Sequence, residues 1–378
     1  MEFRIVHEGS VKLKVPVHEK LERAMPVFYN VDKADDRSLS VALLRCYREM
    51  VGRDLVACDL LSATGVRGLR LACEVPGLRK VVINDVSPRA FMLMRENVRM
   101  NEGCLRCEVE TRNEEANRLL WTVGRRFDYL DVDPFGSPTP FLDAAARSVR
   151  PGGILAVTST DTACLCAVYP KTCFRKYGSV VFKTEYRKEV GVRILAKKVI
   201  EVGAQHCLAL EPVFAYVMGG SFRVYFLVAK GARRADEVLG SIGFILHCER
   251  CLFRRTAHLG ESPEGRCQRC QSRLRLIGPL FIGRLCRAEL GEMMLSAATG
   301  RIRSLIKLIV DENAVGTPWY YTVSALSSRL KAPTPRMDSL IDALRQRGYS
   351  AVRTHYDWAG IKTNAPIEEV EGAFGAAG

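Results

Sequence analysis

The stretch Asp128-Tyr129-Leu130-Asp131-Val132-Asp133-Pro134-Phe135-Gly136-Ser137-Pro138 is typical of a buried strand that runs into a loop. Pro134 cannot donate to the hydrogen bonds of a sheet, so Asp133 is expected where the strand ends. In open α/β sheets, ligands bind outside the carboxyl ends of the strands. A carboxylate and an aromatic ring at that edge suit a flat base with an exocyclic amine. Taken alone, the same residues indicate no more than a turn capped by aspartate. Whether they form a ligand site therefore depends on the rest of the chain.

An earlier segment predicts a cofactor site. A strand-type run at 55–61 leads into the small-residue loop Ser62-Ala63-Thr64-Gly65-Val66-Arg67-Gly68, and a helix is expected after it. This order brings backbone N–H groups and a helix N-terminus close to a ligand, but the loop lacks the G-x-G-x-x-G spacing of pyrophosphate sites. The next strand, 80–84, ends at Asp85, 20 residues after Gly65, which is the spacing at which a carboxylate binds ribose hydroxyls. We therefore expect a cofactor that carries a nucleoside.

Strand and helix patterns alternate along the first 235 residues. Further strands are expected from 109 onward and at 128–132, 154–158 and 221–229, with helices at 87–101 and 140–148. Repeated βα units with right-handed crossovers imply an α/β fold with a doubly wound, mainly parallel sheet. Residues 230–236 are the predicted linker, which divides the 378 residues into domains 1–235 and 236–378.

The second domain contains four cysteines in two close pairs, Cys248, Cys251, Cys267 and Cys270. Two C-x2-C pairs at this separation predict a closed, tetrahedral Zn²⁺ site with a structural role. Helices near 322–330 and 337–347, followed by a strand at 349–354, predict a smaller α+β domain with a winged-helix-like end. The last residues, 372–378, are expected to be disordered.

The other ten cysteines include a C-x2-C pair without a second pair nearby. We predict that Cys104 and Cys107 are buried thiols, although intracellular disulfides stay open as an alternative.

The chain is basic, with 56 Lys and Arg against 42 Asp and Glu, a formal charge of +14. Residues 1–235 carry +10 and residues 236–378 carry +4, so the excess is spread over both domains. Nine basic residues between 171 and 198 face only two acids. This distribution predicts binding of a polyanion.

Targeting signals and membrane segments are not predicted. No apolar run approaches the ~20 residues of a membrane span, and the first residues do not form a secretory signal. We expect a cytoplasmic protein that does not bind a membrane, and no obligatory protein partner is evident.

With these features in place, the chain resembles the tRNA (guanine-26 N2)-dimethyltransferase family of the archaeal type, from about 28 to 366. The resemblance rests on several short motifs spread over this length. They are Val27-Phe28-Tyr29-Asn30 with Arg37, 62–68, Asn84-Asp85, 133–138, Arg175-Lys176-Tyr177-Gly178, Phe222-Arg223-Val224-Tyr225, 278–283, 353–355 and 360–366.

The resemblance implies a Rossmann-like, class I S-adenosylmethionine-dependent methyltransferase that acts on tRNA and gives N2,N2-dimethylguanosine. The first domain is then the methyltransferase domain, and the second binds zinc and tRNA. The contacts to S-adenosylmethionine implied by the family fall on Arg37, Arg67, Asp85, Glu115 and Ala116. The family more often has Asp at position 115.

Two residues are the predicted catalytic pair. Asp133 is expected to accept N2–H hydrogen bonds and align the nitrogen, and Phe135 is expected to stack on the flipped base. Two alternatives stay open. The enzyme could methylate another exocyclic base amine, either N2 of an rRNA guanine or N6 of adenine, or the chain could be a zinc-containing RNA-binding protein without activity.

Overall fold

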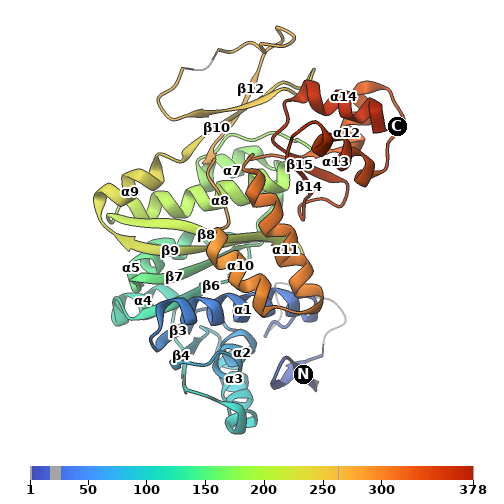
Figure 1. Cartoon of the computed structure of the whole chain (residues 1–378). Helices are drawn as coiled ribbons and strands as arrows, with labels where there is room; N and C mark the ends of the chain where they lie inside the picture. Colours follow the sequence, from blue (N-terminus) through green and yellow to red (C-terminus); the bar gives the residue numbers. More distant parts are fainter. Residues whose placement is uncertain (1, 18–26, 263, 378) are drawn as a thin grey trace.

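A computed structural model describes residues 2–17, 27–262 and 264–377. The strands of its central sheet are β3 (Leu55–Asp59), β4 (Leu78–Asn84), β5 (Glu108–Arg112), β6 (Phe127–Val132), β7 (Val149–Ser159), β8 (Leu208–Met218) and β9 (Ser221–Lys230) (Figure 1). They lie in the order β5-β4-β3-β6-β7-β9-β8. β3 to β7 are parallel, and β9 is antiparallel to both of its neighbours. The predicted doubly wound, mainly parallel sheet is confirmed.

Helices cover both faces of this sheet. They are α1 (Ala34–Val51), α2 (Val66–Glu74), α3 (Pro88–Met100), α4 (Ala116–Val123), α5 (Leu142–Ser148), α6 (Thr162–Leu165), α7 (Pro170–Tyr177), α8 (Arg187–Ala204) and α9 (Ala232–Leu239). Successive residues of a strand point to opposite faces. Leu55 and Ala57 of β3 therefore pack with α1 and α2, whereas Val56 and Cys58 pack with α4, α5 and α8. A strand buried on both faces explains the nearly continuous apolar sequence of β3.

Within the described residues, three short 3-10 helices occur in the loops: η1 (Val31–Lys33), η2 (Glu102–Cys104) and η3 (Thr139–Phe141). An N-terminal hairpin, β1 (Phe3–Glu8) and β2 (Val11–Pro16), packs against α2 and α3. The side chains of Asn97 and Asn101 on α3 accept hydrogen bonds from the backbone N–H groups of Lys14 (2.7 Å) and Lys12 (2.9 Å). These bonds hold β2 in place beside α3.

One cysteine prediction needs correction. Cys104 forms a disulfide with Cys73, with a Cα–Cα distance of 5.4 Å, so it is not a buried thiol. Cys107 is a free thiol and only partly buried. The sequence could not show this pairing, because the two residues lie 31 positions apart.

The second half of the chain begins with a small sheet in the order β11-β10-β12, made of β10 (Ile242–His247), β11 (Arg254–His258) and β12 (Arg275–Phe281). Two helices follow, α10 (Ala288–Ala297) and α11 (Gly300–Val315), and both pack against α1. The chain ends in a module of β13 (Tyr321–Thr322), α12 (Val323–Leu330), α13 (Met337–Gln346), β14 (Ala351–Arg353), β15 (Gly360–Thr363) and α14 (Ile367–Ala377).

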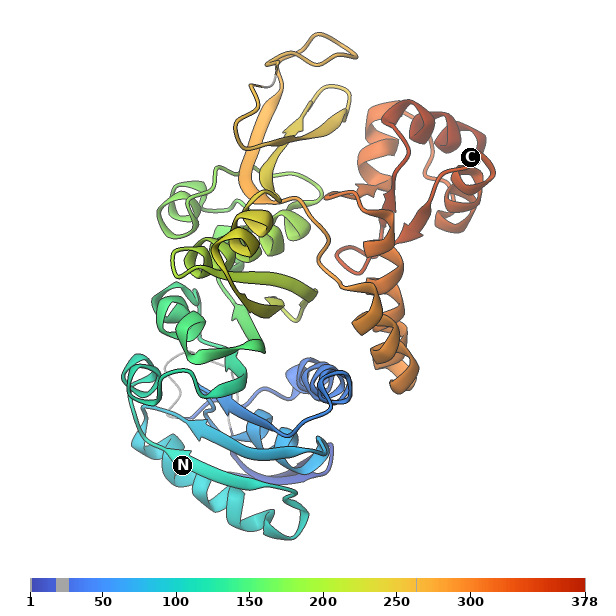
Figure 2. The same cartoon turned by 60° about the vertical axis from the view of Figure 1, so that its left-hand side comes forward.

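The small sheet and the terminal module lie together at one end of the molecule, opposite α2 and α3 (Figures 1 and 2). The predicted order of helix, helix and strand is present in α12, α13 and β14. Two local predictions were wrong. Residues 232–239 form α9 rather than a linker, and 372–377 continue α14 rather than being disordered. The domain division at 235/236 stays a prediction.

No helix in the described ranges combines the length and the apolar composition needed to cross a bilayer.

Candidate functional site

The carboxyl ends of β3, β4 and β6 surround a cavity of about 370 Å³. β3 lies between β4 and β6, so the cavity is at the point where the sheet order reverses direction. Doubly wound sheets bind their ligands at this switch point. The lining comes from segments 28–37, 59–67, 85–86 and 133–141 and from Thr160.

Two glycines, one in the loop after β3 and one in the first turn of α2, allow this segment to pack closely against its neighbours. Gly65 has φ +81° and precedes α2, a backbone conformation that glycine adopts at no steric cost. At Gly68, a Cβ atom would lie 2.1 Å from Cγ2 of Ile83 on β4. The small-residue composition noted in the sequence therefore brings α2 against the sheet and leaves Ser62, Ala63 and Thr64 on the cavity wall.

Asp85 follows β4 and lines the same cavity. Its Oδ2 accepts a hydrogen bond from the backbone N–H of Ala63 (2.9 Å), and its Oδ1 accepts one from Ser87 (2.9 Å). These bonds fix the plane of the carboxylate, and each oxygen keeps a lone pair for a further donor. Burial raises the pKa of Asp85, and the two backbone N–H groups oppose that effect. The side chain is thus a preorganised acceptor on the cavity wall.

Asp133 lies at the end of β6, as predicted, and its half-buried side chain faces two cations. Its Oδ2 accepts a hydrogen bond from Nη2 of Arg67 at 2.6 Å, and its Oδ1 lies 3.9 Å from Nζ of Lys33. Although burial raises the pKa of Asp133, the charges of Lys33 and Arg67 hold it below its usual value. Asp133 is therefore an ionised acceptor at neutral pH.

The sequence analysis did not select Lys33. It lies in the 3-10 turn before α1, and no local pattern distinguishes it from a surface lysine. Only the folded chain brings it beside Asp133.

Arg67 connects the cavity to a buried charge network. Its guanidinium donates to Asp36 (2.7 Å) and to the hydroxyl of Ser40 (2.7 Å), in addition to Asp133. Below this layer, the fully buried Arg223 donates to both carboxylate oxygens of Asp131. Buried charges are tolerated when they are paired and hydrogen-bonded, as these are.

One carboxylate in this region differs from the others. Asp59, at the end of β3, accepts a hydrogen bond from the N–H of Gly68 at 3.0 Å. Burial and the neighbouring Asp131 raise the pKa of Asp59 to about 7. Asp59 is therefore a carboxyl group on the cavity wall that is protonated more readily than Asp133.

The Asp-Pro-Phe-Gly loop is anchored to the end of β7. The N–H of Gly136 donates to Oγ1 of Thr160 (2.6 Å), and its carbonyl accepts from the N–H of Thr160 (2.9 Å). Gly136 has φ +80°, which explains why glycine follows Phe135. The backbone around Asp133 and Phe135 is therefore held rigidly.

Four aromatic side chains line the cavity, and the rings of Phe28 and Phe135 are in contact. The ring of Phe135, which is 44% exposed, lies edge to face with that of Phe28, with 4.8 Å between the centroids. Phe28 belongs to a motif noted in the sequence, but it was given no role there. Two rings at right angles offer one face and one edge to a flat ligand.

Arg37 lines the cavity but has its own partner inside the protein. Its Nε donates to Oε1 of Glu8 at 2.6 Å, and its Nη2 donates to the carbonyl of Asn30 at 2.9 Å. Although burial raises the pKa of Glu8, Arg37 and Arg70 hold it below its usual value. Glu8 of β1 thus sets the orientation of Arg37, and its contact with the cofactor stays a prediction.

Among the predicted catalytic and cofactor-binding residues, Glu115 and Ala116 are the two that do not line this cavity. Glu115 caps α4, where its carboxylate accepts from the N–H groups of Asn117 (3.0 Å) and Arg118 (2.9 Å). Ala116 is buried at the start of the same helix. Asn84 joins this turn to β4 through hydrogen bonds with the backbone of Glu114 (3.1 Å each). The role of Glu115 and Ala116 in cofactor binding stays a prediction.

The four cysteines of the second domain do come together. The Sγ atoms of Cys248, Cys251, Cys267 and Cys270 all lie within 4.8 Å of one another. Two of the Sγ–Sγ distances are 3.5 Å. Tetrahedral zinc with Zn–S bonds of ~2.3 Å requires sulfur separations of ~3.8 Å, so the donor set fits the ion.

The two cysteine pairs have the same local geometry. Leu252 and Gln271 each lie four residues after the first cysteine of their pair, and both have φ +58°. Each donates its N–H to the carbonyl of that cysteine, at 2.9 Å. The first pair, Cys248 and Cys251, forms a knuckle between β10 and β11. The second pair, Cys267 and Cys270, forms a knuckle before β12. Four thiolates without an open position describe a structural site rather than a catalytic one.

Comparisons with known proteins agree with this geometry. The model of the N2,N2-dimethylguanosine tRNA methyltransferase family matches residues 9–374. A tRNA (guanine(26)-N(2))-dimethyltransferase of Methanosphaera stadtmanae is 34% identical over 98% of this chain and 96% of its own length. A tRNA (guanine(26)-N(2)/guanine(27)-N(2))-dimethyltransferase of Aquifex aeolicus is 36% identical over 97% of this chain and 95% of its own.

A solved structure shows the same fold over the whole length. Trm1 from Pyrococcus horikoshii, determined with S-adenosyl-L-methionine, superposes with a TM-score of 0.86 at 34% identity and covers 98% of this chain and 99% of its own. With a matching family model, relatives above 30% identity and a matching fold, the chain belongs to the N2,N2-dimethylguanosine tRNA methyltransferase family.

Proposed function

We propose that this protein transfers methyl groups from S-adenosyl-L-methionine to the exocyclic N2 of guanine 26 in tRNA, giving N2,N2-dimethylguanosine. One observation carries the proposal. An ionised carboxylate, Asp133, shares a cavity at the sheet's switch point with two aromatic rings and with the acceptor Asp85. Such a cavity can hold a nucleoside-bearing methyl donor and a flat base side by side.

The residues present fit the cofactor. Asp85 would accept hydrogen bonds from the two ribose hydroxyls, since its carboxylate is already oriented by Ala63 and Ser87. The loop 62–65 would lie along the methionine part. When bound, S-adenosyl-L-methionine supplies a methyl group activated by its sulfonium. Arg37 and Arg67 line the same cavity.

The target base would enter between the aromatic rings. A guanine inside a folded tRNA has to leave its stack, which costs a few kcal/mol. Phe135 and Phe28 would offset part of this free energy by stacking and by an edge contact on the flipped base. A base held by these rings would present its N2 edge toward Asp133.

Asp133 would accept a hydrogen bond from an N2–H of guanine. This contact draws electron density onto the nitrogen and aligns it for attack, so the contribution is positioning and preorganised charge. The new N–C bond would form as the donor's S–C bond breaks, and the N2 proton would then leave, to Asp133 or to solvent. Arg67 and Lys33 keep the carboxylate ionised and prevent it from rotating. The same geometry serves a second transfer, because monomethylated guanine still has one N2–H to donate.

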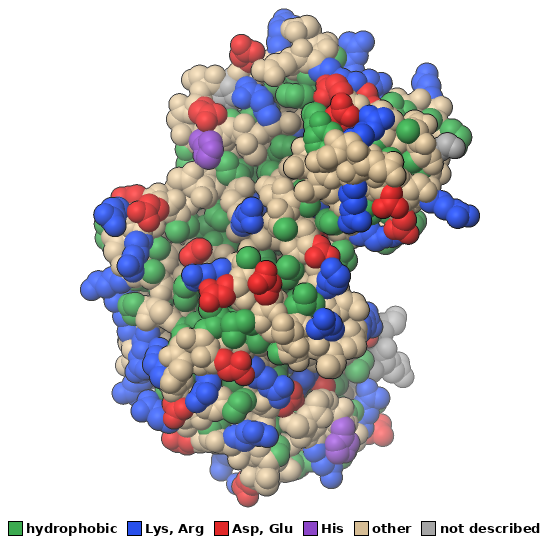
Figure 3. All heavy atoms as spheres, in the orientation of Figure 1, with side chains coloured by type: hydrophobic (Ala, Val, Ile, Leu, Met, Phe, Trp, Pro, Cys, Tyr) green, Lys and Arg blue, Asp and Glu red, His purple; other side chains and the backbone are tan. Residues whose placement is uncertain are grey.

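The two predicted domains would share the binding of tRNA. We assign methyl transfer to residues 1–235 and a supporting, zinc-stabilised tRNA contact to 236–378. On the face shown in Figure 3, Lys and Arg side chains are spread over both parts of the molecule. Phosphate contacts from such a surface hold RNA by shape and charge.

The experiment is nucleoside mass spectrometry after incubating the protein with unmodified tRNA and S-adenosyl-L-methionine. We expect N2,N2-dimethylguanosine at position 26, mapped by digestion of the tRNA. Guanine 27 is analysed in the same digest, because the Aquifex relative is named for both positions. Methylated adenine, or modification of rRNA but not tRNA, would favour another base amine. No methyl transfer at all would favour an RNA-binding protein.

A further inference from the structure

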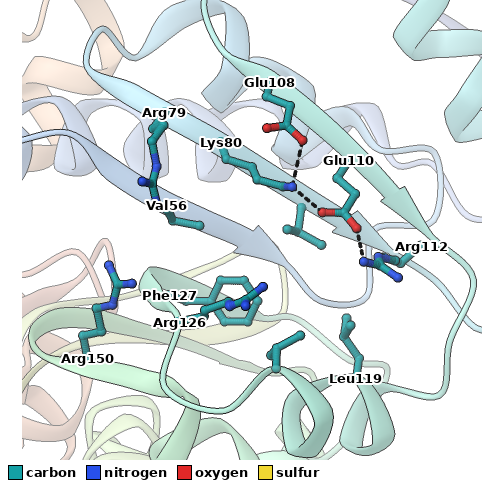
Figure 4. A pocket seen from close by; sticks show the side chains of 12 residues that line it. Val56, Arg79, Lys80, Glu108, Glu110, Arg112, Leu119, Arg126, Phe127 and Arg150 are labelled. Carbon is teal, nitrogen blue, oxygen red and sulfur yellow. Dashed lines mark ion pairs between the residues drawn. The ribbon is translucent and has the colours of Figure 1, made fainter.

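A second cavity lies at the other edge of the central sheet, where the parallel strands begin. Its volume is about 470 Å³, and its lining includes the first residues of β4 to β7 and Val56 of β3 (Figure 4). Arg79 lies on β4 near this edge, and Asp85, at the proposed methyl-transfer cavity, comes six residues later, directly after β4. At ~3.3 Å per residue, Arg79 and Asp85 are about 20 Å apart, and the two cavities have no lining residue in common. The second cavity is therefore separate from the first.

The floor of this cavity is apolar. Val56, Val82, Leu119 and Phe127 line it, and each is at most 6% exposed. They belong to β3, β4, α4 and β6, which pack together in one hydrophobic core. A rigid apolar floor of this kind suits a flat or aliphatic body.

One side of the rim is electrically neutral. Nζ of Lys80 lies 2.7 Å from Glu108 and 2.6 Å from Glu110, and Arg112 also pairs with Glu110. The dashed lines in Figure 4 mark these ion pairs. Two cations and two carboxylates therefore compensate one another there.

The other side of the rim has excess positive charge. Arg79 and Arg126 are exposed, and across the described part of the chain neither guanidinium has an ion-pair or hydrogen-bond partner. Arg150 has a carboxylate partner in Asp128, at 3.4 Å. Figure 4 shows Arg79 and Arg150 on the side away from Arg112, with Arg126 beside Phe127.

Two unpaired guanidiniums over an apolar floor select a particular class of ligand. The planar fork of arginine binds a phosphate through two parallel hydrogen bonds, and its plane also stacks on a flat ring. A plain inorganic anion would leave the floor uncovered, and an uncharged apolar molecule would leave both arginines unpaired. A nucleotide satisfies both parts, and it fits within a cavity of this volume.

We propose that this cavity is a second binding site that takes a nucleotide, with its phosphate held by Arg79 and Arg126 and its base on the floor formed by Val56, Val82 and Phe127. The nucleotide can come from two sources, a free mononucleotide or a nucleotide of the bound tRNA. The inference is independent of how methyl transfer proceeds in the first cavity.

The first test uses adenosine 5′-monophosphate as the probe, measured by isothermal titration calorimetry on the full chain. S-adenosyl-L-homocysteine is kept at saturation, so that the nucleoside part of the first cavity is filled. We expect binding that becomes at least about tenfold weaker in Arg126→Gln and in Arg79→Gln, since each removes charge-assisted hydrogen bonds. Arg125→Gln is the matched control, because Arg125 is the exposed neighbour of Arg126 and does not line the cavity.

The second test measures tRNA affinity of the same variants by filter binding. If the nucleotide belongs to tRNA, Arg126→Gln weakens tRNA binding more than Arg125→Gln does, although both remove one positive charge. If it is free, the two variants bind tRNA equally and differ only with adenosine 5′-monophosphate. The proposal would be overturned if Arg125→Gln and Arg126→Gln had the same affinity for adenosine 5′-monophosphate and also the same affinity for tRNA. This holds whether or not the mononucleotide binds elsewhere.

Discussion

Arg67 and Asp133 form a 2.6 Å hydrogen bond that joins the proposed catalytic carboxylate to the charge network under the sheet edge. The same Nη2 atom of Arg67 also donates to Asp36, at 2.7 Å. Arg67 therefore binds two carboxylates from different parts of the chain and holds Asp133 in one orientation. The family resemblance implied a cofactor contact for Arg67, and its place in the cavity lining is compatible with that role.

Replacing Arg67 should destabilise the protein. In Arg67→Met, Asp131 keeps its buried partner Arg223, but Asp36 loses the cation that pairs with it. Removing one partner of a buried ion pair typically lowers the free energy of unfolding by ~3–5 kcal/mol. Urea denaturation measures this loss, with Arg125→Met as the exposed control. A loss below ~1 kcal/mol, as for a surface ion pair, would show that the network does not hold the sheet edge together.

Lys33 should set the acid limit of the reaction. The charges of Lys33 and Arg67 lower the pKa of Asp133, so the carboxylate stays ionised as the pH falls, until the pH reaches that lowered pKa. In Lys33→Met one of these charges is lost and the pKa of Asp133 rises. The acid limb of the single-turnover rate should then move to higher pH.

Lys33→Arg is the control for this shift, because it keeps the charge near Asp133. Its acid limb should stay close to that of the unchanged protein. An acid limb that is the same in Lys33→Met, or lies at lower pH, would contradict the assignment.

The cysteine cluster should contain one zinc ion per chain. Metal analysis of protein purified without chelator measures this directly, and an absence of zinc would remove the claim. Because the two knuckles join β10, β11 and β12, Cys251→Ser should lower the thermal midpoint before it changes cofactor binding. Cys207→Ser is a suitable control, since Cys207 is an exposed free thiol outside the cluster.

Binding of tRNA should weaken steeply with salt. Basic residues of both domains displace counterions from phosphates, and several such contacts reduce affinity by at least ~10²-fold between ~50 and ~200 mM salt. Filter binding over this range gives the slope. A flat response would mean that the excess charge of +14 does not contact the RNA.

Much of the fold was predictable because its strands are short, apolar and bounded by loop residues. β3, β4, β6 and β7 were placed within a few residues of their observed bounds, apart from the early start of β7. Asp85 and Asp133 were found because residues just after parallel strands meet at one sheet edge. That rule needs no long-range information.

Other features depend on contacts that the local sequence does not encode. Arg37 pairs with Glu8, which lies 29 residues earlier on β1, so its partner could not be inferred from α1 alone. Of the basic residues between 171 and 198, Arg193 and Lys197 are each only 2% exposed. Arg193 bonds to Glu189, and Lys197 donates to the carbonyl of Tyr177 (2.7 Å). These two charges support α8 and do not contribute to a surface for a polyanion.

The catalytic account depends most on Asp133, and the measurement that tests it is the single-turnover rate of Asp133→Ala with saturating tRNA and S-adenosyl-L-methionine. Binding of S-adenosyl-L-methionine is measured on the same preparation, and Asp54→Ala, an exposed carboxylate outside the cavity, is the control. Loss of one preorganised interaction typically reduces the rate by ~10²–10³. We predict such a loss in Asp133→Ala while cofactor binding stays largely intact. Methyl transfer by Asp133→Ala near the rate of the unchanged protein would contradict the account.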